Sequence, residues 1–286
     1  MSAIKSFFKN IIPLPLRDFL RKNEGVIFDF ITNTGRKICS TKYQGYTVFY
    51  NRGNELIRRL RREKIFEPEL FGQITKDLKS VPSPRFVDVG ANIGLIALSV
   101  MRDVPGVHID AFEPGPLQRG FLERAIRENG LIGRVSVHAE ALGDMSGVKK
   151  FAVHNPRDAA KDGFIETGRG AAGETILVPV MTLSEWWIKN GRPKIGVVKI
   201  DTEGAELLVL RGAREFIVEV NPIVYLEIEE RNLRVYPYTA ADIVNFFDEI
   251  GYEITTLSGK QVSSDSIKQA LPHFDTYRAT PYTYKK

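Results

Sequence analysis

Residues 85–94 read RFVDVGANIG, an apolar strand with Asp88 near its end that runs into a turn containing Gly90, Asn92 and Gly94. The helical pattern LIALSVM follows directly. Glycines let the backbone turn tightly and approach a ligand, and the first N–H groups of the following helix point at the same place. Many tight strand-to-helix turns carry two glycines, so the segments that follow decide which ligand this turn holds.

The rest of the chain alternates between strand and helix patterns. Such alternation predicts an α/β protein with a mainly parallel sheet covered on both faces and its strand C-termini along one edge. The last two strands, 252–257 and 276–280, should form an antiparallel pair, and a further strand pair is expected near Gly45. The other predicted strands are 86–89, 108–112, 134–138, 148–153, 176–180, 197–200 and 223–228, and the predicted helices are 95–101, 121–128, 183–188, 205–211 and 240–250.

The composition excludes several classes of protein. The 286 residues are 43% hydrophobic and 26% charged, as in an ordinary globular protein. Cys39 is the one cysteine, which excludes an internal disulfide and a cysteine zinc cluster and favours a reducing, cytoplasmic location. No run of 18 apolar residues occurs, so we expect no transmembrane helix.

The positive charge is concentrated near the N-terminus. Residues 1–80 carry 16 Lys and Arg against 8 Asp and Glu, whereas the whole chain has a net charge of +5. We expect a basic N-terminal extension over 1–80, acting as a cap or binding substrate or a partner, and a catalytic domain over 81–286. The charge predicts an anionic partner such as a phosphorylated acceptor, an acidic glycan or lipid head groups. The cluster Arg58–Arg62 also suits a solvated helix face. Residues 1–22 suit either a peripheral membrane helix or a helix that caps the domain.

Glu113 ends the second predicted strand, 25 positions after Asp88. A carboxylate there can accept both hydroxyls of a ribose, although a surface glutamate beside Pro114 is the alternative. A glycine turn followed by such an acid suits a nicotinamide dinucleotide or S-adenosylmethionine. The dinucleotide turn usually reads G-x-G-x-x-G, whereas Asn92 stands here in place of the middle glycine. An amide crowds a pyrophosphate and suits the amino-acid end of S-adenosylmethionine, so the sulfonium cofactor is favoured.

The next two strand ends also carry polar residues. The third predicted strand ends in HAEALGD, where Glu140 can accept from the adenine amine and the backbone of Ala141 and Leu142 can meet the ring edge. The fourth ends in IDTEGAE, which places Asp201 at the strand tip. Glu203 and Glu206 follow on the first turn of a helix, where acidic residues also serve as caps.

With these segments in order, the chain resembles the FkbM family of S-adenosylmethionine-dependent methyltransferases. The resemblance covers about residues 65–257 and lies in FEPELFGQI, FVDVGANIGLIALSV, AFEPGP, AEALGD, VPVMTLSEWW, VVKIDTEGAELLVLRGA and PIVYLEIEE. It implies a Rossmann-like class I methyltransferase fold: a seven-stranded, mainly parallel sheet with an antiparallel last strand, preceded here by an N-terminal helical and β extension. It also implies methyl transfer, usually to a hydroxyl oxygen of a sugar, polyketide or other metabolite. The cofactor-binding residues that it implies are Asp88, Gly90, Asn92, Gly94, Glu113, Glu140, Ala141, Leu142 and Asp201, with Glu67 either near the cofactor's amino group or in a salt bridge.

An alcohol that accepts a methyl group needs a base or a metal ion to lower its pKa. Asp201 is the first candidate for either role. The strand IVYLEIEE places Glu227 and Glu229 on one face at the neighbouring strand end. Asp201 with Glu229, or with Glu227, would form an oxygen-rich site suited to Mg²⁺. His154 is the other candidate base, or else a solvated loop histidine.

The acceptor is the least specified part of the prediction. The loop 154–173 holds Arg157, Lys161 and Arg169 among small residues, which suits a lid over an anionic acceptor or a plain surface loop. We expect O-methylation of a hydroxyl on a sugar, glycan precursor or secondary metabolite. An RNA methyltransferase using the basic N-terminal region is the first alternative, although no RNA-binding module or aromatic-basic stripe supports it. A non-catalytic scaffold is the second, and the full set of cofactor-site residues disfavours it.

Overall fold

The computed structural model describes residues 38–81, 84–154, 162–165, 173–273 and 275–282. The predictions for residues 1–22 and for Arg157, Lys161 and Arg169 therefore lie outside the described residues. Within the described ranges, no helix is long and apolar enough to cross a membrane.

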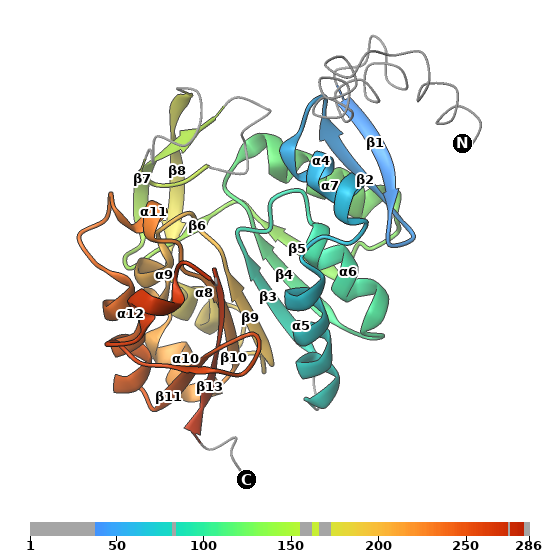
Figure 1. Ribbon diagram of the computed structural model, residues 1–286. Coiled ribbons are helices and arrows are strands. Elements are labelled where there is room, and N and C mark those ends of the chain that lie inside the picture. Colours follow the sequence, from blue (N-terminus) through green and yellow to red (C-terminus); the bar gives the residue numbers. More distant parts are fainter. Residues whose placement is uncertain (1–37, 82–83, 155–161, 166–172, 274, 283–286) are drawn as a thin grey trace, which may run out of the picture.

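The centre of the fold is a mainly parallel sheet with the strand order β12-β11-β13-β10-β9-β3-β4-β5 (Figure 1). The prediction of an α/β fold with an antiparallel last strand is confirmed, since β13 runs antiparallel to both of its neighbours. The sheet has one strand more than the predicted seven, the two-residue β12. Two residues are too short to show a strand pattern in the sequence, so this strand was not predicted. The strands are β3 (Arg85–Val89), β4 (His108–Phe112), β5 (Val135–His138), β9 (Val197–Ile200), β10 (Ile223–Glu227), β11 (Tyr252–Thr256), β12 (Gln261–Val262) and β13 (Thr276–Pro281).

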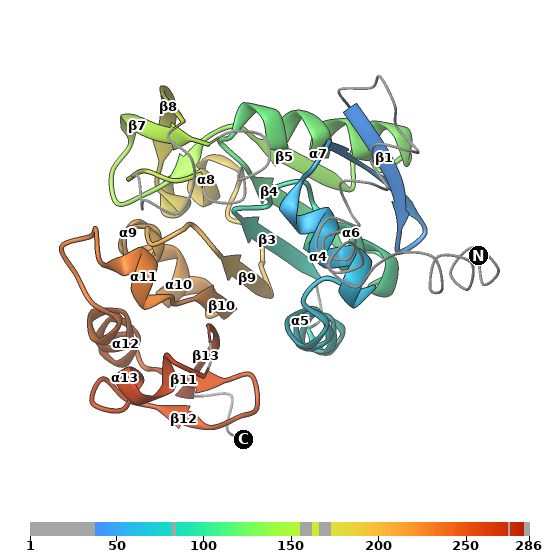
Figure 2. The ribbon, with the colours of Figure 1, turned by 45° about the horizontal axis from the view of Figure 1, so that its top comes forward.

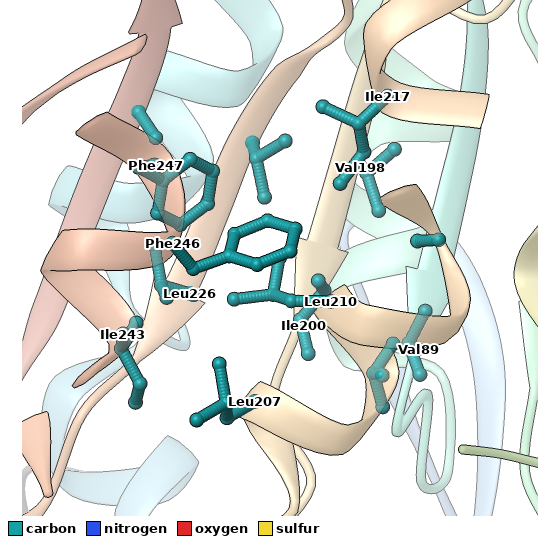
Figure 3. Packing of buried hydrophobic residues seen from close by; sticks show 14 of the residues in the cluster. Val89, Val198, Ile200, Leu207, Leu210, Ile217, Leu226, Ile243, Phe246 and Phe247 are labelled. Carbon is teal, nitrogen blue, oxygen red and sulfur yellow. The ribbon is translucent and has the colours of Figure 1, made fainter. Parts of the chain in front are cut away.

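Helices cover both faces of this sheet because alternate residues of its strands point to opposite sides. Phe86 and Val197 pack in one hydrophobic cluster with α5 (Pro68–Ser80), α6 (Leu95–Asp103) and α7 (Pro116–Glu128). Val87 and Val198 pack in the other. Figure 3 shows the second cluster, where Phe246 and Phe247 lie close to residues of β9 and β10. Its helices are α8 (Leu183–Lys189), α9 (Glu206–Gly212), α10 (Arg214–Val220), α11 (Glu230–Leu233), α12 (Ala240–Glu249) and α13 (Ile267–Ala270).

The described part of the N-terminal region packs onto the first of these faces. The strand pair expected near Gly45 is confirmed as the hairpin of β1 (Ile38–Tyr43) and β2 (Tyr46–Asn51), followed by α4 (Glu55–Glu63). Figures 1 and 2 show the hairpin beside α7. There the backbone N–H of Thr47 donates to Asn129 Oδ1 at 2.8 Å, and Asn129 Nδ2 returns a bond of the same length to the Thr47 carbonyl. The proposed division at residue 80 stays a prediction.

A second, three-stranded sheet lies beside the central one. It has the order β6-β8-β7 and consists of β6 (Ala141–Leu142), β7 (Gly147–Val153) and β8 (Glu174–Met181). The prediction of two short strands on either side of a polar loop is therefore confirmed. Between β7 and β8, Gly163 forms an isolated bridge with Ala152, which holds the segment 162–165 against β7.

Candidate functional site

A pocket of about 570 Å³ lies at the carboxyl ends of β3, β4, β9 and β10, the edge at which open α/β sheets bind ligands. Residues from α4 and the start of α5 form another wall. An adjoining pocket of about 50 Å³ lies beside β6 and shares Gly90, Glu113 and Asp201 with the first. Of the predicted site residues, Glu67, Asp88, Gly90, Asn92, Glu113, Asp201, Glu227 and Glu229 line the larger pocket, and Glu140, Ala141 and Leu142 line the smaller one.

The two glycines of the opening turn have different roles. Gly90 has φ +78°, and a β-carbon there would lie 1.9 Å from the carbonyl oxygen of Asp201. Only glycine therefore lets the turn after β3 pass the end of β9. Gly94 has φ +86° and lines neither pocket; a β-carbon there would lie 2.5 Å from Leu122 Cδ1. Its absent side chain allows α6 to pack close to α7.

Asn92 and Glu113 are joined through the backbone. Asn92 has φ 51°, a conformation that asparagine tolerates better than most residues, and its Oδ1 accepts from the backbone N–H of Ile93 at 2.8 Å. Glu113 accepts from the backbone N–H groups of Asn92 at 2.8 Å and Gly115 at 2.7 Å. Burial raises the pKa of Glu113 to about 7. A carboxylate offers about four acceptor positions, so Glu113 keeps capacity to accept hydroxyls from a ligand.

A buried lysine that is not among the predicted site residues lies between the ends of β3 and β9. Lys199 pairs in register with Asp88 and is 5% exposed. Its Nζ lies 3.1 Å from Asp201 Oδ2 and 3.5 Å from Asp88 Oδ1. Burial opposes the charge of Lys199, but Asp201, Asp88 and Glu67 outweigh it, so the pKa of Lys199 is raised. The signal in the sequence was a lysine inside the buried strand VVKI, which requires carboxylate partners.

Asp88 is the most buried acid of this group, at 1% exposure. Burial raises the pKa of its carboxyl group. Among the described residues, the ion pair with Lys199 at 3.5 Å is its charged contact, and neither carboxylate oxygen accepts a close hydrogen bond. A buried carboxylate in this state, on the wall of a pocket, is suited to bind a ligand that carries an ammonium group.

Glu67 shows features of both predicted roles, a position at the cofactor pocket and a salt bridge. It lines the larger pocket at the start of α5, and Arg59 Nη1 lies 3.3 Å from its Oε1. Burial, followed by the charge of Asp201, raises the pKa of Glu67 to about 7.

The acids of the IDTEGAE segment divide into a turn brace and pocket residues. Glu206 Oε1 accepts from the backbone N–H of Thr202 at 2.9 Å, from the Thr202 hydroxyl at 3.0 Å and from the backbone N–H of Gly204 at 3.2 Å. Burial raises the pKa of Glu206 to about 7. Glu206 therefore holds the turn, as the capping interpretation proposed, whereas Glu203 faces the pocket and accepts from Asn232 Nδ2 at 2.9 Å.

A group of three carboxylates could hold a metal ion. Asp201, Glu203 and Glu227 each offer an oxygen, and these oxygens lie within 4.8 Å of one another. Burial, followed by the charge of Asp201, raises the pKa of Glu227 well above its usual value. The predicted metal ligand Glu229 is outside this group, and its carboxylate is paired with Arg231.

His154 is buried and lines neither pocket. Its Nδ1 lies 3.2 Å from Asp162 Oδ1, and its backbone N–H donates to the same oxygen at 2.7 Å. In the described part of this loop it is Asp162, and not the predicted His154, that lines both pockets. His154 does not lie at the wall of either pocket, and its catalytic role stays a prediction.

Comparisons with known sequences give one family. A family model described as the methyltransferase FkbM domain matches residues 88–254. The chain is 30% identical over 162 residues to 31-O-demethyl-FK506 methyltransferase FkbM of Streptomyces tacrolimicus. This alignment covers 47% of this chain and 61% of that relative. It is 29% identical over 175 residues to methyltransferase sdnD of Sordaria araneosa (51% and 67% covered) and 26% identical over 165 residues to 2-O-methyltransferase NoeI of Sinorhizobium fredii (53% and 66% covered). The chain thus spans less than two thirds of the first relative.

Solved structures also show some likeness. A crystal structure of a methyltransferase FkbM from Methylobacillus flagellatus gives a TM-score of 0.45 at 18% identity, over 75% of this chain and 50% of that one. A methyltransferase from Agrobacterium tumefaciens gives a TM-score of 0.46 at 9% identity, over 88% of this chain and 72% of that one.

Proposed function

The chain belongs to the FkbM methyltransferase family, and we propose that it transfers a methyl group from S-adenosylmethionine to a hydroxyl oxygen of a sugar, glycan precursor or secondary metabolite. The observation that carries the proposal is the buried carboxylate of Asp88 on the pocket wall, beside the glycine turn and Glu113, with Lys199 on one side and hydrogen-bonding capacity left for a ligand. These groups match the ammonium and ribose parts of that cofactor.

The residues around the pockets fit S-adenosylmethionine part by part. Asp88 would accept from its ammonium group, and Glu113 from the ribose hydroxyls. The smaller pocket, with Phe112, Phe164 and Leu142 on its walls, offers apolar surface to the adenine. Glu140 lines the same pocket and would accept from the exocyclic amine. When bound, the cofactor supplies an electrophilic methyl group on a sulfonium.

The protein's own part in the reaction is to orient the acceptor, exclude water and take up a proton. Positioning requires the two reacting atoms to be about 3–3.5 Å apart. Asp201 and Glu227 are the proposed proton acceptors because both line the pocket beyond the glycine turn. A carboxyl group with a raised pKa, such as Glu227, is the stronger base once ionised.

The acceptor is proposed to be rich in neutral hydroxyls. Ten carboxylate residues but only Arg59, Arg62, Lys199 and Arg231 line the larger pocket among the described residues, and carboxylates accept hydroxyl hydrogen bonds well. The printed names of two relatives, a 31-O-demethyl-FK506 methyltransferase and a 2-O-methyltransferase, support transfer to oxygen. For an anionic acceptor, Arg59 and Arg62 of α4 line the same pocket, whereas Arg157, Lys161 and Arg169 lie outside the described residues.

A divalent cation such as Mg²⁺ is a second proposal for this site. The three oxygens of Asp201, Glu203 and Glu227 suit a hard cation, which would lower the pKa of an acceptor hydroxyl. Luminescence of Tb³⁺ displaced by Mg²⁺ would test it, with Glu203→Gln and Glu227→Gln expected to abolish the signal. An unchanged signal in both variants would remove the cation from the proposal.

The function is tested by methyl incorporation from labelled S-adenosylmethionine into a panel of nucleotide sugars, glycans, hydroxylated metabolites and RNA. We expect label on a hydroxylated small molecule or glycan, and we expect Asp201→Asn to keep cofactor binding while turnover is lost. Label only on RNA would favour the alternative acceptor, and label on no acceptor would favour a scaffold. Normal turnover by Asp201→Asn would exclude Asp201 as base and as metal ligand.

A further inference from the structure

Asp162 enters the site from outside the sheet edge that supplies Asp88, Glu113 and Asp201. It lies between β7 and β8, and it lines both the larger pocket and the smaller one. Its side chain is 5% exposed. The strand-end motifs supply Glu113 and Asp201 to both pockets, but they do not account for this third shared acid.

The position of Asp162 is fixed by three hydrogen-bonding groups. Oδ1 accepts from the backbone N–H of His154 and lies near its Nδ1, while Oδ2 accepts from Gln118 Nε2 at 2.9 Å. Gln118 belongs to α7, the helix that begins just after Glu113. Asp162 is therefore held in a defined position relative to Glu113, although Glu113 follows β4 of the central sheet and Asp162 lies in the segment between β7 and β8.

The carboxylates of Asp162 and Glu113 border one small space. A β-carbon placed on Gly115 would lie 2.8 Å from Glu113 Oε1 and 3.3 Å from Asp162 Oδ2. Both groups are acceptors when ionised, and in the absence of ligand they repel each other. The charge of Asp162 adds to burial in raising the pKa of Glu113. A ligand with two adjacent hydroxyls would give each carboxylate a donor.

We propose that Asp162 is a second ribose-recognition residue, so that the two hydroxyls of the cofactor's nucleoside are shared between Glu113 and Asp162. This inference rests on the proposed function of the site. His154 then acts as a positioning residue that holds Asp162. Phe164, two residues further along the same segment, lines the smaller pocket and supplies apolar surface to the base.

The test is calorimetric titration of the full chain with adenosine, 2′-deoxyadenosine and 3′-deoxyadenosine. In the wild type, loss of the hydroxyl that faces Asp162 should weaken binding about 10- to 100-fold, as for a hydrogen bond to a charged group. Asp162→Ala should weaken adenosine by a similar factor and leave the affinity for that deoxynucleoside unchanged. Asp162→Asn keeps an acceptor oxygen, so its affinity for adenosine should lie between those of the wild type and Asp162→Ala. This variant remains informative if the alanine variant fails to fold.

Asp144→Ala is the matched control, because Asp144 pairs with Lys149 at 2.8 Å and lines neither pocket. It should change none of the three affinities. Equal weakening of all three nucleosides by Asp162→Ala would overturn the inference, since it would show that Asp162 only shapes the segment; unchanged affinities would overturn it as well. A wild-type protein that binds S-adenosylmethionine but none of the nucleosides would overturn the inference, whereas one that binds none of these four ligands would contradict the proposed function itself.

Discussion

Replacing Lys199 with methionine should destabilise the protein by stranding the carboxylate of Asp88. Methionine keeps much of the length of lysine and removes the ammonium that lies 3.5 Å from Asp88 and 3.1 Å from Asp201. Breaking a buried ion pair by removing one partner costs about 3–5 kcal/mol. Because the Asp201 side chain is 31% exposed, water can take over part of its interaction. We therefore expect the free energy of unfolding to fall by about 3 kcal/mol, near the lower end of that range.

Urea denaturation of Lys199→Met, Asp88→Asn and the double variant measures this effect. The double variant should be more stable than Lys199→Met alone, because it removes the stranded charge together with its partner, with a coupling energy of about 1 kcal/mol or more. Lys199→Arg keeps the charge and should lose less stability than Lys199→Met. The reasoning would be refuted if the free energy of unfolding of Lys199→Met lay within about 0.5 kcal/mol of the wild-type value. It would also be refuted if the effects of Lys199→Met and Asp88→Asn on that free energy were additive in the double variant.

Two further predictions concern the turns that shape the pocket. Gly90→Ala should lower the free energy of unfolding by roughly 2–4 kcal/mol, since its β-carbon would overlap the Asp201 carbonyl at a positive φ. The control is Gly120→Ala, which lies in a helix with open space around it and should be neutral or stabilising. Equal effects of the two substitutions in urea denaturation would contradict the role of Gly90. The raised pKa of Glu206, about 7 against 4.5, means that its contribution to stability is fully present below about pH 4.5 and is lost as the pH rises through 7. Glu206→Gln should therefore remove up to about 3 kcal/mol of the stability difference between pH 4.5 and pH 8, at 1.36 kcal/mol per pKa unit; an unchanged pH dependence would show that Glu206 is ionised at little cost in the folded state.

The sequence predicts the strand ends well because local patterns determine them. The strands at 108–112 and 197–200 have the predicted bounds, and the others differ by one or two residues at an end. Parallel strands bring their carboxyl ends to one edge, so the sequence alone predicts that Asp88, Glu113 and Asp201 meet there.

The remaining site residues depend on pairings between distant parts of the chain. Lys199 becomes meaningful only once β9 is known to lie beside β3, because register then places it next to Asp88. Asp162 reaches the pocket through the pairing of β7 with β8 and its bond to Gln118, and neither follows from the spacing of residues in the loop. Glu206 resembles a pocket acid in sequence, but its oxygen is occupied by the turn that it stabilises.

Thermal unfolding with and without S-adenosylmethionine tests the central claim most directly, because it requires no knowledge of the acceptor. A ligand at 100 times its Kd stabilises the folded state by about 2.7 kcal/mol, which corresponds to a rise in Tm of roughly 4–5 °C for a protein of this size. We predict this rise for the wild type and for the control Glu123→Ala, whose side chain is 44% exposed on α7. Glu113→Ala should show no rise. No rise in the wild type, or an equal rise in Glu113→Ala, would contradict a cofactor site built on the glycine turn and Glu113.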